Sequence, residues 1–388
     1  MTFPLPIVSV QLAASVFLLL LLIFVFKQTQ SLRLFPVRVF VTEWGHVVAV
    51  ISLAIAVSAD RSVFLGQLAT TLAGLATLGF LTPYFRAQFA VANVRAAIEP
   101  AFGPLTGDPV RFWRLFALPR LRSPRFRKLD FAGPGGPLHV DFSPGPSGRH
   151  SPLIVAVHGG GWAGGVSAEG ADWAEWARSQ GWARASVHYR LVPYATWPAQ
   201  REDVLAAIDY LQSHSNELGV DPDCLVLLGR SAGGQIAASI ASDGTLDYLR
   251  GCISYYAPYD LHYAFEHSRD DDGLRSRCLI RDYLGGNPDA VPAQYDEASP
   301  SVTIRPEAPP FLLFHGGNDE LVNIAQTRRF ADCLAAANVP HAVVEFPWAT
   351  HAFDYNLRGP AGQLTAACLA TFLDSVRQPR HIDSNAAP

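Results

Sequence analysis

Residues 225–234 read Leu-Val-Leu-Leu-Gly-Arg-Ser-Ala-Gly-Gly: an apolar run breaks into glycines around a serine, and small residues continue to Ala241. Glycines two positions before and after Ser231 allow a sharp strand-to-helix turn, because side chains there would collide with neighbouring backbone. Such a turn, called a nucleophile elbow, exposes the serine hydroxyl and aims the first amides of the next helix at the group that it attacks. An ordinary glycine-rich turn is the alternative.

The chain around this turn, from residue 129 onward, alternates short apolar or β-branched runs with helical patterns. The runs expected to form strands are 128–132 and 138–142, as an antiparallel hairpin, and 153–157, 183–189, 225–228, 252–256, 311–314 and 342–346. The helical patterns are 171–178, 202–212, 231–242, 325–336 and 362–376. This alternation predicts a mostly parallel sheet with helices on both faces. Residues 261–309 interrupt it, and we interpret them as an insertion over the strand ends.

A second glycine cluster, His158-Gly-Gly-Gly-Trp162, directly follows the strand expected at 153–157. Hydrolysis of an ester by an attacking hydroxyl forms a tetrahedral oxyanion, which needs backbone N–H donors within about 3 Å. Consecutive glycines let the main chain come that close. We therefore predict Gly160 and Gly161 as oxyanion donors, together with the amide of Ala232, the residue after the serine.

The same glycines also fit a different motif, a dinucleotide fingerprint at Gly159-x-Gly161-x-x-Gly164, for which Arg190 could contact a nucleotide phosphate. This interpretation leaves the serine turn unexplained. The sequence contains neither an H-E-x-x-H motif nor a G-K-[ST] loop. We therefore expect no cofactor and no metal ion.

A catalytic serine needs an imidazole that accepts its proton and a carboxylate that orients the imidazole. In hydrolases with this order of strands and helices, the acid and the histidine follow the serine, each on a loop after a late strand. Asp319 follows the strand expected at 311–314, and His351 follows the one at 342–346. We predict both as partners of Ser231. The alternative acids are Glu320, Asp260 and Asp354.

Two tryptophans adjoin these predicted catalytic loops. Trp162 ends the glycine cluster, and Trp348 lies three residues before His351. We predict that both contact the substrate, whereas the other tryptophans of this region are expected in the core.

Length and charge limit the possible classes of function. The chain has 388 residues and a net charge of −4, so no basic field suggests a nucleic-acid partner. The length fits one α/β domain with an appendage. The five cysteines are odd in number and form no C-x-x-C pair, which argues against a disulfide framework and against a zinc site.

The N-terminal residues, 1–83, have the composition of a membrane region. Residues 7–26 and 62–82 are uncharged and long enough to cross a bilayer, and 44–59 is a shorter third candidate. A secretory signal is the alternative for the first run, but no Lys or Arg precedes it and no small-x-small site follows. The distribution of Lys and Arg then predicts three spans with a cytoplasmic catalytic domain, and the orientation inverts if 44–59 does not cross.

Residues 84–128 are expected to connect this region to the α/β domain. The second half of the connector mixes basic and aromatic side chains: Arg111, Phe112, Trp113, Arg114, Phe116, Arg120, Arg122, Arg125, Arg127 and Lys128. Such a segment either lies on an anionic lipid surface or forms a solvated linker. The α/β domain is then 129–378, followed by a tail at 379–388.

The domain at 129–378 resembles an α/β-hydrolase, and is similar to hormone-sensitive-lipase and feruloyl-esterase-like carboxylesterases and to membrane-bound prenylcysteine methylesterases. The motifs that carry the resemblance are His158-Gly-Gly-Gly-Trp162, Tyr189-Arg-Leu-Val-Pro193, Trp197-Pro-Ala-Gln-Arg-Glu-Asp203, Gly229-Arg-Ser-Ala-Gly-Gly234, Ala298-Ser-Pro300, His315-Gly-Gly-Asn-Asp319 and His351-Ala-Phe353. The resemblance implies esterase activity, with Ser231, Asp319 and His351 as the triad. Arg230 and Val192-Pro-Tyr194 depart from the usual pattern.

Together these features predict a membrane-anchored serine carboxylesterase that acts on a small-molecule or lipid ester. Two alternatives use the same scaffold. One is an acyltransferase that passes the acyl group to an alcohol instead of water. The other is a ligand receptor without catalytic activity.

Overall fold

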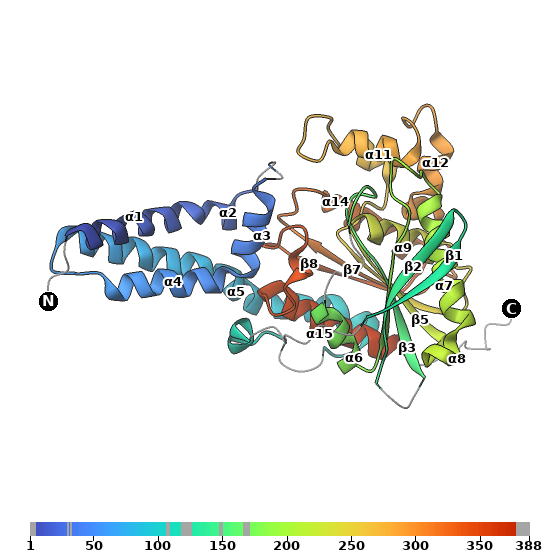
Figure 1. Cartoon of the computed structure of the whole chain (residues 1–388), viewed down its shortest axis with the longest axis horizontal. Coiled ribbons are helices and arrows are strands. Elements are labelled where there is room, and N and C mark those ends of the chain that lie inside the picture. The colour runs from blue at the N-terminus through green and yellow to red at the C-terminus, as the bar shows by residue number, and fades with distance from the viewer. Residues whose placement is uncertain are drawn as a thin grey trace.

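The computed structural model describes residues 5–28, 31, 33–105, 109–117, 126–146, 150–165 and 171–377. An α/β domain forms one end of the molecule, and a group of N-terminal helices projects from its side (Figure 1). The predicted tail at 379–388 lies outside the described residues, as do Arg120, Arg122 and Arg125 of the basic segment.

Eight strands form one sheet in the order β1-β2-β4-β3-β5-β6-β7-β8. The strands are β1 (Arg127–Gly133), β2 (Gly136–Ser143), β3 (Ser151–Val157), β4 (Ala183–Val187), β5 (Val220–Arg230), β6 (Leu249–Tyr255), β7 (Phe311–Gly316) and β8 (His341–Phe346). β1 and β2 form the predicted antiparallel hairpin, β2 is antiparallel to β4 as well, and the remaining pairs are parallel. The predicted mostly parallel sheet is confirmed.

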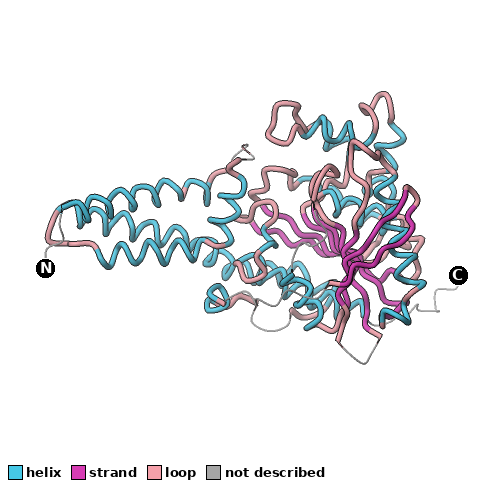
Figure 2. The backbone as a smooth tube through the Cα atoms, in the orientation of Figure 1, coloured by secondary structure: helices cyan, strands magenta, loops and turns pink. Residues whose placement is uncertain are grey.

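Helices cover both faces of this sheet (Figure 2), and β5 shows why its sequence is a continuous apolar run. Leu225 and Leu227 belong to one hydrophobic core, and Val226 and Leu228 to another on the opposite face. The first core includes α7 (Ala199–Ser213), α9 (Ala232–Ser242) and α14 (Ala325–Ala336), and the second includes α6 (Ala171–Ser179) and α15 (Pro360–Arg377). The short helices α8 (Ser215–Leu218) and η2 (Phe353–Tyr355) precede β5 and α15.

The predicted insertion lies between β6 and β7 and consists of four short helices. These are α10 (Leu261–Glu266), α11 (Ser276–Leu284), α12 (Pro292–Glu297) and α13 (Pro300–Thr303). Tyr283 and Tyr295 are fully buried and belong to the first core, so the insertion is packed onto the domain.

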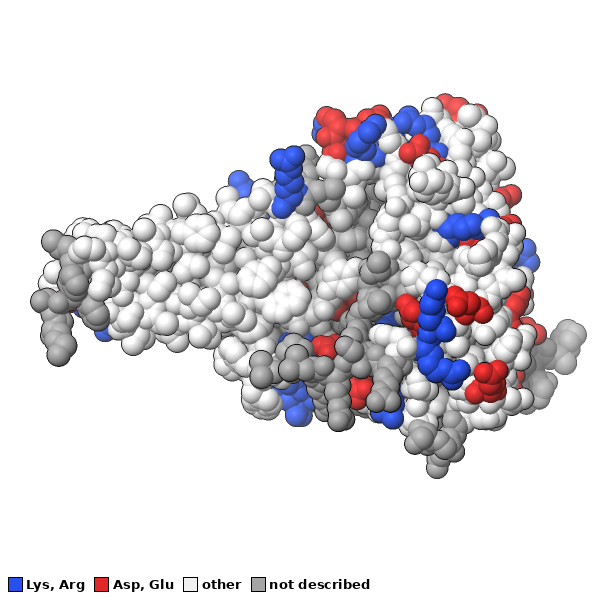
Figure 3. Space-filling model, viewed as in Figure 1, with Lys and Arg blue, Asp and Glu red and all other residues white. Residues whose placement is uncertain are grey.

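Among its described residues, the N-terminal region contains five helices: α1 (Leu5–Leu21), α2 (Ile23–Phe26), α3 (Phe35–Glu43), α4 (Gly45–Ser58) and α5 (Phe64–Phe102). The long helices α1, α4 and α5 pack side by side around a small core that includes Leu22, Ala76 and Phe80 (Figure 1). Their outer surface is apolar, with Phe64 75% exposed and Leu20 68% exposed. Figure 3 shows almost no charged side chains along this projection, in contrast to the α/β domain.

These helices coincide with the apolar runs of the sequence. The segments 6–26 and 64–102 are each long and apolar enough to cross a bilayer. The helices α3 and α4 pass the same test as a pair, but they are bent by 74° at Trp44. The described part of the chain therefore offers two candidate spans, or three if the bent pair is one span.

The structure differs from the sequence expectation after residue 82. We expected a connector from residue 84, but α5 continues without a break to Phe102. One side of this second half, which includes Ala87, Val94 and Ile98, is buried in the second core against the sheet and α15. The α/β domain therefore uses part of α5 as one of its own covering helices. The aromatic segment of the connector contains a single turn, η1 (Phe112–Phe116).

Candidate active site

Ser231 lies at the junction of β5 and α9 with φ 52° and ψ −120°, a conformation that residues other than glycine rarely adopt. Its backbone N–H donates to Tyr255 O at 2.9 Å, which fixes the turn against the end of β6. A Cβ atom at Gly229 would overlap the Gly233 carbonyl, and one at Gly233 would overlap the Val157 carbonyl. The two glycines are therefore required by close packing of backbone, as the motif predicts.

The glycine cluster after β3 passes directly beside this turn. A Cβ atom at Gly159 would lie 3.0 Å from Arg230 O and 3.3 Å from Ser231 Cβ. Gly160 and Gly161 have φ values of 116° and 59°, which glycine adopts without strain. The backbone of the cluster can thus approach the serine closely, which the predicted oxyanion donors require.

His351 and Asp319 form a buried hydrogen-bonded pair at the ends of two neighbouring strands. The distance between His351 Nδ1 and Asp319 Oδ2 is 2.7 Å. The other carboxylate oxygen accepts the backbone N–H groups of Leu321 at 2.8 Å and Val322 at 2.9 Å. Each oxygen of the carboxylate therefore has partners, and its orientation toward the imidazole is fixed.

The charge of Asp319 is stabilised in the folded protein. Burial would raise the pKa of its carboxyl group, but the His351 imidazole and hydrogen bonds from His315 and His351 outweigh burial. The pKa therefore lies well below the ordinary value for aspartate. The distance from His315 Nε2 to Asp319 Oδ2 is 3.3 Å, so the carboxylate lies between two histidines.

The three alternative acids have other partners. Asp354 is paired with Arg230 and accepts a hydrogen bond from Tyr256. Asp260 caps α10 by accepting the backbone N–H of Tyr263 and forms an ion pair with Arg329. Glu320 forms an ion pair with Arg38. Among the four acids, Asp319 is the one hydrogen-bonded to the His351 imidazole.

The predicted catalytic groups line one cavity of about 640 Å³. Ser231, His351 and Asp319 contribute to its wall, as do the predicted oxyanion donors Gly160, Gly161 and Ala232. The insertion contributes further wall residues, among them Tyr263, Ala264, Leu279 and Ile280. The N-terminal region also contributes, through Gln28, Ser31 and Phe35, which the sequence did not suggest.

The two tryptophans predicted at the substrate pocket lie in different places. Trp162 lines the cavity, but its ring is stacked on Tyr283 at 4.1 Å, and its Nε1 donates to Gln235 Oε1 at 3.0 Å. It thus fastens the glycine cluster to α9 and to the insertion. Trp348 is 2% exposed and belongs to the second core, outside the residues that line the cavity. The side chain leaves the loop on the side that faces α5.

Sequence patterns do not indicate the buried polar group that lies beside His351. The Tyr256 ring lies 4.1 Å from the His351 ring, and the Tyr256 hydroxyl donates to Asp354. Burial and the adjacent Asp354 carboxylate raise the pKa of Tyr256 well above its ordinary value, so this hydroxyl stays protonated and donates. Asp354 also binds the Arg230 guanidinium, so the departure from the motif at residue 230 is a side chain with a buried partner.

Within the residues that the structure describes, one cluster of possible metal ligands lies away from the cavity. The ligand atoms of His139, Asp141 and His188 lie within 4.8 Å of one another. The three residues meet because β2 and β4 are neighbours, which sequence spacing could not indicate. His188 Nε2 and Asp141 Oδ2 are 3.2 Å apart and form an ion pair when the histidine is protonated. None of the three lines the cavity with Ser231.

Comparisons with known proteins show the family of the chain. The family model BD-FAE matches residues 142–334. Esterase LipQ of Mycobacterium tuberculosis is 30% identical over 316 residues, which cover 72% of this chain and 73% of LipQ. The chain belongs to the carboxylesterase family of α/β-hydrolases. This esterase is therefore a carboxylic ester hydrolase, as its sequence motifs predict.

Two further likenesses concern shorter or more distant matches. The isoprenylcysteine α-carbonyl methylesterase ICME of Arabidopsis thaliana is 25% identical over 214 residues, which cover 52% of the esterase and 50% of ICME. The crystal structure of EstE1, a thermostable carboxylesterase cloned from a metagenomic library, also matches this chain. Its TM-score is 0.58 at 21% identity, over 76% of this chain and 98% of EstE1. The latter likeness shows the α/β-hydrolase fold.

Proposed function

We propose that the esterase is a membrane-anchored serine hydrolase that cleaves carboxylic esters through Ser231, His351 and Asp319. The observation that carries the proposal is the buried His351–Asp319 hydrogen bond, 2.7 Å long, in the same cavity as the strained Ser231 turn. A serine on a strained turn, an imidazole and a buried carboxylate are the groups that nucleophilic acyl transfer needs.

In the proposed reaction, the Ser231 hydroxyl attacks the acyl carbon of the ester while His351 Nε2 accepts its proton. The alcohol then leaves as His351 returns the proton to it, and an acyl-enzyme remains on Ser231. Water attacks the acyl-enzyme with the same assistance from His351 and releases the acid. Asp319 holds the proton on Nδ1, so that Nε2 is the atom free to accept one.

The negative oxygen of each tetrahedral intermediate would be stabilised by the backbone amides of Gly160, Gly161 and Ala232. These residues line the cavity wall beside Ser231, and Ala232 is the first residue of α9, where backbone N–H groups have no helical partner. The conformations of the two glycines favour the close approach that such donors need.

Membrane anchoring is supported by the exposed apolar surface of α1, α4 and α5 and by the charges at their ends. Lys27 and Arg33 lie at the end nearest the α/β domain, and Arg86 is there as well, with its guanidinium 5.8 Å from the Phe26 ring. Arg61 lies in the turn at the opposite end. With three spans, the excess of basic residues favours a cytoplasmic α/β domain.

The triad is tested by Ser231→Ala in the full chain, purified in detergent micelles. We expect kcat for p-nitrophenyl butyrate to fall about 10³-fold or more, because the nucleophile is lost while the cavity is kept. A fluorophosphonate should label the wild-type protein and leave this variant unlabelled. Ser213→Ala, an exposed serine at the end of α7, serves as the control and should keep normal activity and labelling. Near-normal hydrolysis by Ser231→Ala would contradict the proposal.

A further inference from the structure

The helix α3 lies where the N-terminal helices meet the α/β domain (Figure 1). It meets α4 at an angle of 74°, and its residue Arg38 is 0% exposed. A guanidinium stays charged at all relevant pH values, and burying it is costly unless carboxylate or carbonyl oxygens surround it. The partners of Arg38 therefore show where α3 is held.

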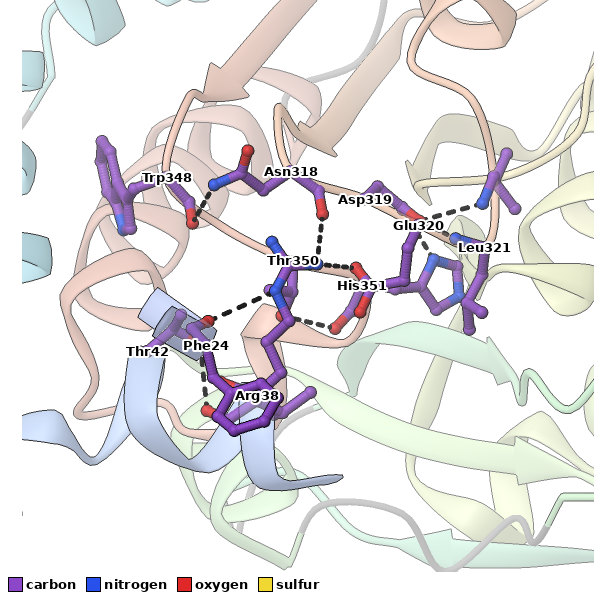
Figure 4. A network of polar contacts seen from close by, with 12 residues as sticks. Phe24, Arg38, Thr42, Asn318, Asp319, Glu320, Leu321, Trp348, Thr350 and His351 are labelled. Carbon is purple, nitrogen blue, oxygen red and sulfur yellow. Dashed lines mark hydrogen bonds and ion pairs between the residues drawn. The ribbon is translucent and has the colours of Figure 1, made fainter. Parts of the chain in front are cut away.

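Two of those partners flank the catalytic acid on its loop (Figure 4). Arg38 Nη1 donates to Asn318 O at 3.1 Å and to Glu320 Oε2 at 2.6 Å. Asn318 and Glu320 are the residues immediately before and after Asp319. On the other side, Arg38 Nε donates to Phe24 O at 3.3 Å, so the guanidinium joins α2 to the acid loop. One side chain thus connects the membrane helices to both neighbours of Asp319.

The position of this loop matters for the proposed triad. The Asp319 carboxylate reaches His351 Nδ1 because the loop backbone also supplies it with the N–H groups of Leu321 and Val322. A shift of the loop by a fraction of an ångström would change the direction of the bond to His351. In catalysis, misplacement of about 1 Å can cost about 10²-fold in rate.

A second contact brings α3 to the histidine itself. Phe35, three residues before Arg38, lines the cavity, and its ring centroid lies 6.5 Å from that of His351. At the other end of α3, Asn356 Nδ2 donates to Glu43 O at 2.9 Å, which fastens the helix to the chain that follows His351. The helix therefore touches both loops that carry the proposed base and acid.

We propose that Arg38 is a positioning residue of the esterase, which holds the loop of Asp319 in register with His351 from the membrane region. The N-terminal helices then form a working part of the active site in addition to an anchor. This role rests on the proposed triad. Arg38 itself lies behind the loop and does not line the cavity, so it acts through Asn318 and Glu320.

The test compares Arg38→Met and Arg38→Lys with the wild type, as full chains in the same micelles. For p-nitrophenyl butyrate we expect Arg38→Met to lower kcat about 10-fold with KM changed less than about twofold, because the loop is displaced while the pocket is kept. Arg38→Lys keeps the positive charge beside Glu320 and should recover part of the lost kcat. A merely structural loss of folded protein would lower the amount of labelled enzyme rather than kcat per labelled site.

The pH profile supplies a second readout. Burial raises the pKa of Glu320, and Arg38 opposes this while the adjacent Asp319 adds to it. Without Arg38, Glu320 should bind a proton at higher pH, so the activity profile of Arg38→Met should show this ionisation at a higher pH than that of the wild type. The double variant Arg38→Met/Glu320→Gln should lose that ionisation, because it has no carboxyl group at this position.

The control is Arg201→Met, which removes a different partly buried ion pair, that of Arg201 with Asp243 between α7 and the end of α9. Normal kcat and an unchanged pH profile in Arg38→Met, or an equal loss in Arg201→Met, would overturn the role of Arg38. Should Arg38→Met fail to fold, Glu320→Gln decides: a kcat lowered about threefold supports the role, and a normal kcat overturns it.

Failure of the proposed function would look different. A wild-type protein that neither hydrolyses the ester nor reacts with a fluorophosphonate would contradict the triad, and the role of Arg38 would fall with it. An active and labelled wild type beside a fully active Arg38→Met would contradict the positioning role alone.

Discussion

At the scale of single residues, two buried carboxylates are connected to His351, one directly and one through Tyr256. Asp319 bonds to the imidazole directly, whereas Asp354 binds Arg230 and the Tyr256 hydroxyl, and the Tyr256 ring packs against the imidazole. Arg230 offsets the charge of Asp354, and of the two carboxylates it is Asp319 that is hydrogen-bonded to the imidazole. The imidazole is therefore polarised from its Nδ1 side, where Asp319 lies.

The ionisation of Asp319 predicts a pH-dependent contribution to stability. Its pKa is lowered in the folded protein, so its contribution is fully present above the unfolded pKa of about 3.9 and is lost as the pH falls toward the folded pKa. Asp319→Asn should therefore lower Tm at pH 6, and the difference from wild type should shrink below about pH 4. Thermal unfolding of both proteins in micelles at pH 6 and pH 3 measures this. An equal difference in Tm at both values would contradict the assignment.

At the scale of elements, α5 performs two tasks along its length of 39 residues. Its first half packs with α1 and α4, and its second half covers the sheet beside α15. The buried positions of the second half, Ala87, Ala90, Val94 and Ile98, repeat every three or four residues, which places them on one side of the helix. The second half is therefore an amphipathic helix of the α/β domain.

This arrangement predicts that α5 contributes to the stability of the α/β domain. Ile98 is fully buried, so Ile98→Ala should lower the free energy of unfolding by about 2 to 5 kcal/mol. Phe89→Ala, on the same helix at a position 81% exposed, is the matched control and should change it by less than about 0.5 kcal/mol. Urea unfolding followed by tryptophan fluorescence reports on both. Similar losses in the two variants would contradict the packing of α5.

The elements of the α/β domain could be predicted because their signals are local. The apolar runs of the strands and the glycines around Ser231 are each recognisable within a few residues. The order of Ser231, Asp319 and His351 along the chain then predicts which loops carry the acid and the histidine. The second half of α5 was missed because Pro83 and Pro100 resemble helix ends and charged residues interrupt the apolar run, although the spacing of its buried positions is helical.

Other features could not be predicted because they depend on contacts between distant segments. The bond of Arg38 to Glu320 spans 282 positions, and that of Arg230 to Asp354 spans 124. No local pattern indicates such pairs. Arg38 lies in the sequence between the apolar runs 7–26 and 44–59, a position typical of a charge beside a membrane, whereas its guanidinium is buried against the acid loop. Trp348 illustrates the same limit, since its neighbours in sequence do not show which side of the loop it faces.

At the scale of the whole molecule, an apolar helical projection is joined to a charged α/β domain (Figure 3). If the projection lies in a bilayer, the esterase should behave as an integral membrane protein. We expect it to sediment with membranes, to remain there after washing at pH 11 or in high salt, and to be released by detergent. Release by either wash without detergent would contradict membrane insertion.

The double use of α5 sets where a water-soluble derivative of this protein can begin. A truncation at residue 129, the start of the strand pattern, would remove α5. Phe372 and Trp348 would then be exposed, and the resulting apolar surface would favour aggregation. Cutting near residue 84 keeps that cover but discards Arg38. Such a shortened protein is expected to stay folded but to have a low kcat, because the Asp319 loop has lost Arg38. Solubility and kcat would therefore have to be engineered separately.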